Sequence, residues 1–257
     1  MFTKQKLFAT TLAVALSAVA FSGIARAADP APAPAAADPQ AYQMLKGAYD
    51  ARLTLPEDFP GFDAQITYQE GNKTATGTIA YRGGYNCTVE VKGLEGEDLK
   101  WLQRQARSFV IHRTSGDFDE SEGKLPLSFA KSEITDFGKL IEYNDPQKLD
   151  SRVRDNQALE MTRTAGDKRF FISVLENTEY EPGKFIPTRY VVSYFDPQSR
   201  VLQAVNIFEN NYVKMGDVWL PSTRRVVSID HVLGDGLRIR SFQFKDIKLV
   251  DKKTDKK

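Results

Sequence analysis

The chain has 257 residues and nearly balanced charges, with 35 Lys and Arg against 34 Asp and Glu and a formal net charge of +1. Such a balance exerts no long-range attraction on nucleic acid or an anionic membrane, so we expect no nucleic-acid partner. The single cysteine excludes an intramolecular disulfide, and a chain of this length can instead rely on its hydrophobic core.

The first 27 residues have the three-part layout of a secretory signal peptide. Lys4 and Lys6 precede the apolar run 7–24, and Ala25-Arg26-Ala27 places small residues at −3 and −1 of a cut before Ala28. The run is also close to the minimum for a membrane span, so an uncleaved anchor is the alternative. We favour cleavage because Thr, Ser and Gly dilute the run. The sequence therefore predicts an exported protein, periplasmic or extracellular.

Composition divides the rest of the chain into a linker, one domain and a tail. Residues 28–38 are rich in Ala and Pro and predict an extended linker. We expect a single β-rich domain over 39–250 and a basic tail over 251–257. Asp38-Pro39 supplies an N-cap and an N1 proline for a first helix that ends near Leu53.

After a turn-rich stretch, the hydrophobic period changes to two. Three segments, separated by turns at Gly71 and at Gly83-Gly84, predict a meander of strands. Cys87 falls on the apolar side of the third strand and is expected to be buried. Apolar residues then recur at helical spacing from Leu99 and predict a second helix, which ends with His112 near its C-terminus.

The remainder predicts strands at short, regular spacing and no parallel βαβ unit. Two of these segments, 170–175 and 190–195, are apolar on both faces. The predicted fold is therefore mainly β, a strongly curved antiparallel sheet that forms an incomplete barrel, with two α-helices packed on it or closing its mouth. The expected strands are 125–129, 140–143, 158–163, 169–175, 189–195, 201–208, 224–229 and 237–250.

No motif states a reaction. His112 and His231 lie far apart, and neither has a second ligand at metal-binding spacing, so we predict no metal site. The acidic run 117–123 departs from a calcium loop in its glycine position and at its twelfth residue. We therefore predict no catalytic residue and no cofactor.

Aromatic and branched side chains of the C-terminal half are the remaining signal. Core packing is their ordinary role, and the alternative is the lining of an apolar ligand cavity inside a half-open barrel. The residues expected to line such a cavity are Phe170, Ile172, Tyr190, Val192, Tyr194 and Trp219.

Two groups of motifs resemble known families. The segment Asp58-Phe59-Pro60-Gly61-Phe62, with His112-Arg113 and the later Phe118 and Gly123, resembles an exported bacterial family of unknown function. Phe195-Asp196-Pro197, the strand 201–208 and the segment 216–221, which reads G-x-x-W-x-P, resemble periplasmic lipoprotein carriers. That second resemblance implies an incomplete antiparallel barrel with helices as a lid and acyl chains held inside.

These observations favour an exported, non-enzymatic protein that binds a lipid or another hydrophobic small molecule. The first alternative is a structural or partner-binding module of the cell envelope that contacts another envelope protein. A hydrolase with an unidentified pair of acids is the weakest alternative.

Overall fold

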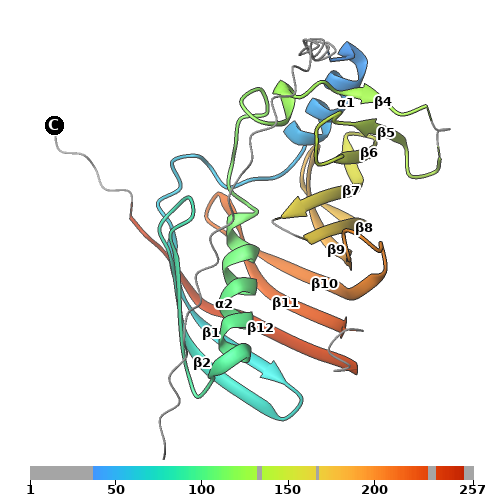
Figure 1. Cartoon of the computed structure of the whole chain (residues 1–257). Coiled ribbons are helices and arrows are strands. Elements are labelled where there is room, and N and C mark those ends of the chain that lie inside the picture. The colour runs from blue at the N-terminus through green and yellow to red at the C-terminus, as the bar shows by residue number, and fades with distance from the viewer. Residues whose placement is uncertain (1–36, 132–134, 166–167, 231–235, 252–257) are drawn as a thin grey trace, which may run out of the picture. The chain divides into compact units, whose positions relative to one another are not determined.

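Twelve strands form one open antiparallel sheet in the computed structural model (Figure 1), which describes residues 37–131, 135–165, 168–230 and 236–251. The strand order is β3-β2-β1-β12-β11-β10-β9-β8-β7-β6-β5-β4, so β3 and β4 form the two edges. The sheet is curved and does not close on itself. The prediction of a mainly β, incomplete barrel with two helices is confirmed. The segment 1–27, most of the linker 28–38, His231 and most of the tail lie outside the described residues.

The helices are α1, Pro39–Asp50, and α2, Gly96–Ile111, with a 3₁₀ turn at Glu122–Lys124. The strands are β1 Phe62–Glu70, β2 Lys73–Tyr81, β3 Cys87–Lys92, β4 Ser128–Phe129, β5 Lys139–Glu142, β6 Asp150–Arg154, β7 Gln157–Ala165, β8 Lys168–Glu181, β9 Lys184–Phe195, β10 Leu202–Met215, β11 Val218–Asp230 and β12 Gly236–Leu249.

The first helix is set by its cap and packs on one end of the sheet. The Asp38 carboxylate accepts hydrogen bonds from the backbone N–H of Gln40 at 2.8 Å and of Ala41 at 3.2 Å, as expected of an N-cap. The helix ends before Leu53 because the Leu53 N–H donates to the carbonyl of Phe185 instead. Its buried side lies in a small hydrophobic cluster with residues of β5 and β6.

The second helix packs on the other end of the sheet. Its buried side, Trp101, Leu102, Ala106, Phe109 and Val110, belongs to a larger cluster with β1, β2, β3, β9, β10, β11 and β12. Edge-to-face contacts join the helix to the sheet, with ring centroids 6.1 Å apart for Trp101 and Tyr68 and 5.9 Å apart for Phe109 and Phe242. The fold thus has two hydrophobic clusters on one sheet.

Some strands differ from the predicted ones. The predicted meander is present as β1, β2 and β3, while β6, a short and polar segment, was missed. Strands β8 to β11 extend well beyond their apolar parts, because their polar ends still pair with neighbouring strands, as at Glu181 and Lys184. The segment predicted over 125–129 keeps only its last two residues as β4, after the 3₁₀ turn.

Burial of Cys87 gives a first prediction. The side chain is 4% exposed, and this burial raises the pKa of the thiol to about 11. Because the thiolate is the reactive form, we expect Cys87 in the folded protein to react with a thiol reagent at pH 8 at least about 100-fold more slowly than in the unfolded chain. Absorbance after addition of a chromogenic disulfide, with and without denaturant, measures the ratio. Equal rates would contradict a buried thiol.

Candidate ligand-binding face

Five of the six predicted ligand-lining residues lie together on β8 and β9. In the register of these strands Phe170 lies opposite Tyr194 and Ile172 opposite Val192, while Tyr190 lies opposite Phe208 of β10. Directly paired residues point to the same face of a sheet, so these side chains are neighbours. The rings of Phe170 and Tyr194 have centroids 5.8 Å apart, and those of Tyr190 and Phe208 stack at 4.7 Å. We call these five predicted residues, together with Phe208, the aromatic patch: Phe170, Ile172, Tyr190, Val192, Tyr194 and Phe208.

Trp219, the sixth predicted residue, is not part of the aromatic patch. It lies opposite Lys214 at the far end of the β10–β11 pair, six residues along the strand from Phe208, or roughly 20 Å away. Its ring packs on Tyr180, with centroids 4.5 Å apart. Trp219 therefore contributes to a separate aromatic contact at that end of the sheet.

The aromatic patch lies on the inner face, by which we mean the face that carries both helices. Cross-strand pairs run from Tyr194 through Phe170 to Arg163, whose guanidinium contacts Tyr143 of the α1 cluster. The backbone of α1 lies near β4, β6 and β7, whereas that of α2 lies near β3 and β11. The aromatic patch falls between the two helices, on β8, β9 and β10 (Figure 1).

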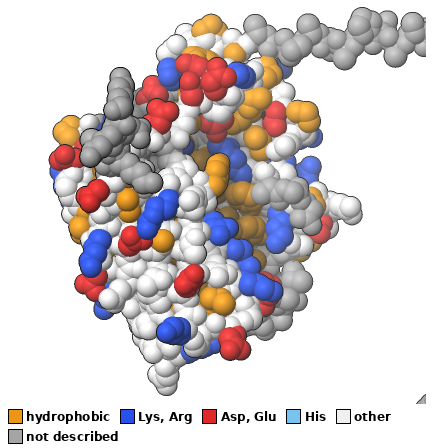
Figure 2. Space-filling model, turned by 90° about the vertical axis from the view of Figure 1, so that its left-hand side faces the viewer, with side chains coloured by type: hydrophobic (Ala, Val, Ile, Leu, Met, Phe, Trp, Pro, Cys, Tyr) orange, Lys and Arg blue, Asp and Glu red, His pale blue; other side chains and the backbone are white. Residues whose placement is uncertain are grey.

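The exposure of the aromatic patch is graded. Val192 and Phe208 are 6% and 5% exposed and form its floor, whereas its remaining four side chains are only half-buried. Figure 2 shows hydrophobic side chains at the bottom of a hollow that Lys and Arg side chains flank. The aromatic patch is therefore a partly buried apolar surface that continues the hydrophobic cluster under α2.

A buried arginine, missed at the sequence level, borders the aromatic patch on the α2 side. Arg224 is 2% exposed. Its Nε donates to Asn210 Oδ1 at 2.9 Å, its Nη2 to the Tyr190 hydroxyl at 3.1 Å, and its Nη1 to the backbone and side-chain oxygens of Gln105 at 3.3 Å. These acceptors are all neutral, so the guanidinium brings an uncompensated positive charge to this border.

The same side carries two further buried arginines that stack on aromatic rings. Arg240 lies over Trp101 with its guanidinium carbon 4.0 Å from the ring centroid, and Arg113 lies over Tyr212 at 5.0 Å. Burial lowers the pKa of both guanidinium groups. The Nε of Arg113 donates to the carbonyl of Leu53 at 2.9 Å, which attaches the end of α2 to the segment before β1.

A second polar group borders the aromatic patch on the α1 side. Arg163 lies opposite Phe170 and donates from Nη2 to the Tyr143 hydroxyl at 3.2 Å, to Ser151 Oγ at 3.3 Å and to Glu122 Oε1 at 3.4 Å. The aromatic patch is therefore apolar in its middle and has a guanidinium at each side, Arg224 and Arg163. This arrangement suits an amphiphile with a hydrogen-bond acceptor or a negative charge at one end.

One cavity reaches Phe170 but lies mainly on the other face of the sheet, because Arg169, Phe171 and Phe195 alternate with the aromatic patch along β8 and β9. Its volume is ≈ 530 Å³, and the residues of the Phe195-Asp196-Pro197 motif form one wall. Asp196 fixes this turn by accepting hydrogen bonds from the N–H groups of Gln198 and Ser199, which also hold the pKa of its carboxyl below the usual range. The remaining lining residues are Lys148, Thr162, Arg169, Phe171 and Arg200.

The described residues contain neither a group of side chains suited to a metal ion nor a helix suited to crossing a membrane. Within residues 37–131, 135–165, 168–230 and 236–251, no three His, Cys, Asp or Glu side chains are grouped so that they could hold a metal ion. In the same part of the chain, no helix has the length and apolar character needed to cross a membrane.

The chain belongs to the family described as "Protein of unknown function (DUF3386)", whose model matches residues 36–250. The expectation of a family of unknown function is thereby confirmed. No protein of curated function matches the chain significantly.

Several solved structures share features of the fold at low identity. A domain from Vibrio parahaemolyticus, named for outer membrane lipoprotein sorting, is 10% identical with a TM-score of 0.38, over 82% of this chain and 92% of that one. A DUF1329 family protein from Desulfovibrio piger is 10% identical with a TM-score of 0.27, over 80% and 93%. The first is of the kind that residues 195–221 resemble. At these scores the likeness supports no inference about activity or ligand.

The neighbours Arg224 and Arg225 give a second prediction because they point to opposite faces. Arg225 pairs with Glu209 at 2.8 Å on the outer face, where its side chain is 42% exposed. Arg224→Ala leaves the Tyr190 hydroxyl and Asn210 without their partner and opens a void, so we expect a loss of about 3 kcal/mol in the free energy of unfolding.

Arg225→Ala is the matched control, with an expected loss within about 0.5 kcal/mol. Urea unfolding followed by circular dichroism measures both variants. Equal losses would show that Arg224 is not an organising contact of the inner face.

Proposed function

We propose that this chain is an exported, non-catalytic protein that binds an apolar or amphiphilic ligand on its inner face, between α1 and α2. The observation that carries the proposal is the aromatic patch, a continuous group of partly buried apolar side chains that packs against the α2 cluster and is not covered by either helix backbone. A protein normally covers such a surface or uses it to bind.

The two ends of the aromatic patch support a ligand with a polar end. Arg224 and Arg163 flank an apolar stretch that crosses β8, β9 and β10, a width of about 10 Å at the usual strand spacing. An acyl chain or an aromatic skeleton fills such a stretch, and a carboxylate or phosphate can accept hydrogen bonds from a guanidinium at its end. The ligand class supported best is therefore a lipid or a similar amphiphile.

The layout of residues 1–27 supports export, and the proposed ligand is accordingly one met outside the cytoplasm. A periplasmic or extracellular location fits a chain that needs no disulfide. Cleavage before Ala28 and the division into linker, domain and tail form part of this proposal.

A second function, as a partner-binding module of the envelope, is favoured by a different surface. On the outer face of β12, Leu237 and Ile239 are 62% and 43% exposed. They lie opposite Ile229 and Val227 of β11, which makes a small apolar area. An envelope protein could cover this area without using the aromatic patch.

Substitutions on the two faces of β8 test the binding proposal. Ile172 lies in the aromatic patch, whereas Leu175 of the same strand is 58% exposed outside it. We expect Ile172→Asp to weaken binding of a fluorescent fatty-acid probe at least about tenfold, because the carboxylate would lose its hydration against the apolar ligand. Leu175→Asp makes the same change of chemistry and should leave the affinity within about twofold.

Native mass spectrometry of protein purified from its own host provides an independent measurement, with a co-purified lipid as the expected result. Circular dichroism is used to check that both variants fold. The proposal fails if the folded wild-type protein carries no lipid and binds no probe, or if Ile172→Asp binds the probe as well as the wild type does.

A further inference from the structure

The side of α2 that faces away from the sheet forms a groove with a concentrated positive charge. Lys100, Arg104 and Arg107 all lie exposed along this side, and the groove has a volume of ≈ 390 Å³. We call it the basic groove, and its other lining residues are Tyr85, Gln103, Ser108, Ile111 and His112. None of the eight is acidic.

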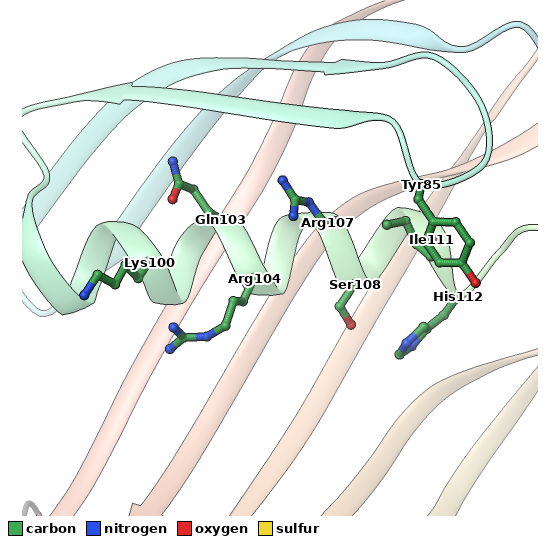
Figure 3. Close-up of a pocket in the computed structure, with 8 residues that line it drawn as sticks. All are labelled: Tyr85, Lys100, Gln103, Arg104, Arg107, Ser108, Ile111 and His112. Carbon is green, nitrogen blue, oxygen red and sulfur yellow. The ribbon is translucent and has the colours of Figure 1, made fainter. Parts of the chain in front are cut away.

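Helical spacing explains how one helix builds both this groove and the core contact. The residues at 101, 102, 106, 109 and 110 are buried against the sheet, and those that line the groove occupy the remaining positions of the turn. Figure 3 shows Lys100, Arg104, Ser108 and His112 on one side of the helix and Gln103 and Arg107 on the other. The basic groove and the aromatic patch therefore share no residue, although His112 at the end of the groove lies near Arg224, so that burial and this positive charge lower its pKa.

One acidic side chain, Glu97, lies close to two of these cations, Lys100 and Arg104. Lys100 pairs with Glu97 at 2.9 Å, but both side chains are more than 60% exposed, so water screens the pair. Arg107 donates to the backbone carbonyl of Cys87, which leaves its charge uncompensated. Since the whole chain has a net charge of only +1, the groove is a local concentration of charge and does not reflect a basic protein.

An aromatic side chain projects at one end of the groove. Tyr85 is 85% exposed, the most exposed of the large hydrophobic residues described. It sits in the β2–β3 turn after Gly83 and Gly84, whose φ angles of 83° and 51° belong to the left-handed region. Figure 3 shows the ring over Ile111. The turn thus holds an apolar ring with a polar hydroxyl out in solvent.

We propose that the basic groove and Tyr85 form a contact surface for an anionic lipid bilayer. Cations attract anionic headgroups, and a tyrosine ring is suited to the boundary between headgroups and acyl chains. Ile111 and the Tyr85 ring supply the apolar part of that boundary. The inference goes beyond ligand binding on the inner face, because it assigns a docking surface on the other side of α2.

Vesicle sedimentation of the exported protein tests the proposal. We expect binding to vesicles of phosphatidylglycerol and phosphatidylcholine, a steep loss of binding from about 0.05 M to about 0.5 M NaCl, and none to phosphatidylcholine alone. The double variant Lys100→Glu/Arg104→Glu should bind at least about tenfold more weakly. Tyr85→Ser should weaken binding by about threefold or more.

Lys245→Glu/Lys248→Glu is the matched control, because it makes the same charge change at exposed positions of β12 and should keep wild-type binding. Ile172→Asp should also keep it, so failure of the inner-face proposal and failure of this one are distinguishable. If the signal peptide, residues 1–27, were retained, its apolar run would bind vesicles with and without phosphatidylglycerol alike. The proposal is overturned if the protein does not bind vesicles that contain phosphatidylglycerol. It is also overturned if both charge-reversal variants lose vesicle binding equally, or if the protein binds only a soluble acidic protein.

Discussion

The stacking of arginine on aromatic rings holds α2 in place, and the rest of the inner face depends on it. Arg240 covers Trp101 near the start of the helix, and Arg224 lies 4.3 Å from the ring centroid of Phe109 near its end. A guanidinium is planar and weakly hydrated, so it can be buried against a ring at a smaller desolvation penalty than an ammonium group. These contacts attach α2 to β11 and β12 at two points along its length.

The choice of neutral partners for these arginines has an electrostatic consequence. A buried guanidinium paired with a carboxylate would be locally neutral, whereas Arg224 bonds to Asn210, Gln105 and the Tyr190 hydroxyl. Arg224 therefore keeps its positive charge beside an apolar surface, whereas Arg163 is paired with Glu122. This combination favours a molecule that is apolar along most of its length and negative at one end.

The sequence predicted the architecture and most of the aromatic patch, but not its polar borders. The two-sided apolar character of 170–175 and 190–195 drew attention to Ile172 and Val192, and only the register of β8 and β9 shows that they are neighbours. Arg224 and Arg225 are adjacent and chemically identical, so only the strand register decides which one points inward. Trp219 lies away from the aromatic patch because β10 and β11 extend much further than their apolar parts, which carries the ring to the far end. The basic groove was hidden by a balanced overall composition.

The two hydrophobic clusters of the fold share one continuous sheet, with α1 over one end and α2 over the other. The distance between the helices is therefore set by the twist and curvature of β8, β9 and β10. A small change in twist at each strand would add up across the sheet and widen or narrow the opening above the aromatic patch. In this fold, the bending stiffness of three strands therefore limits how far α1 and α2 can move apart.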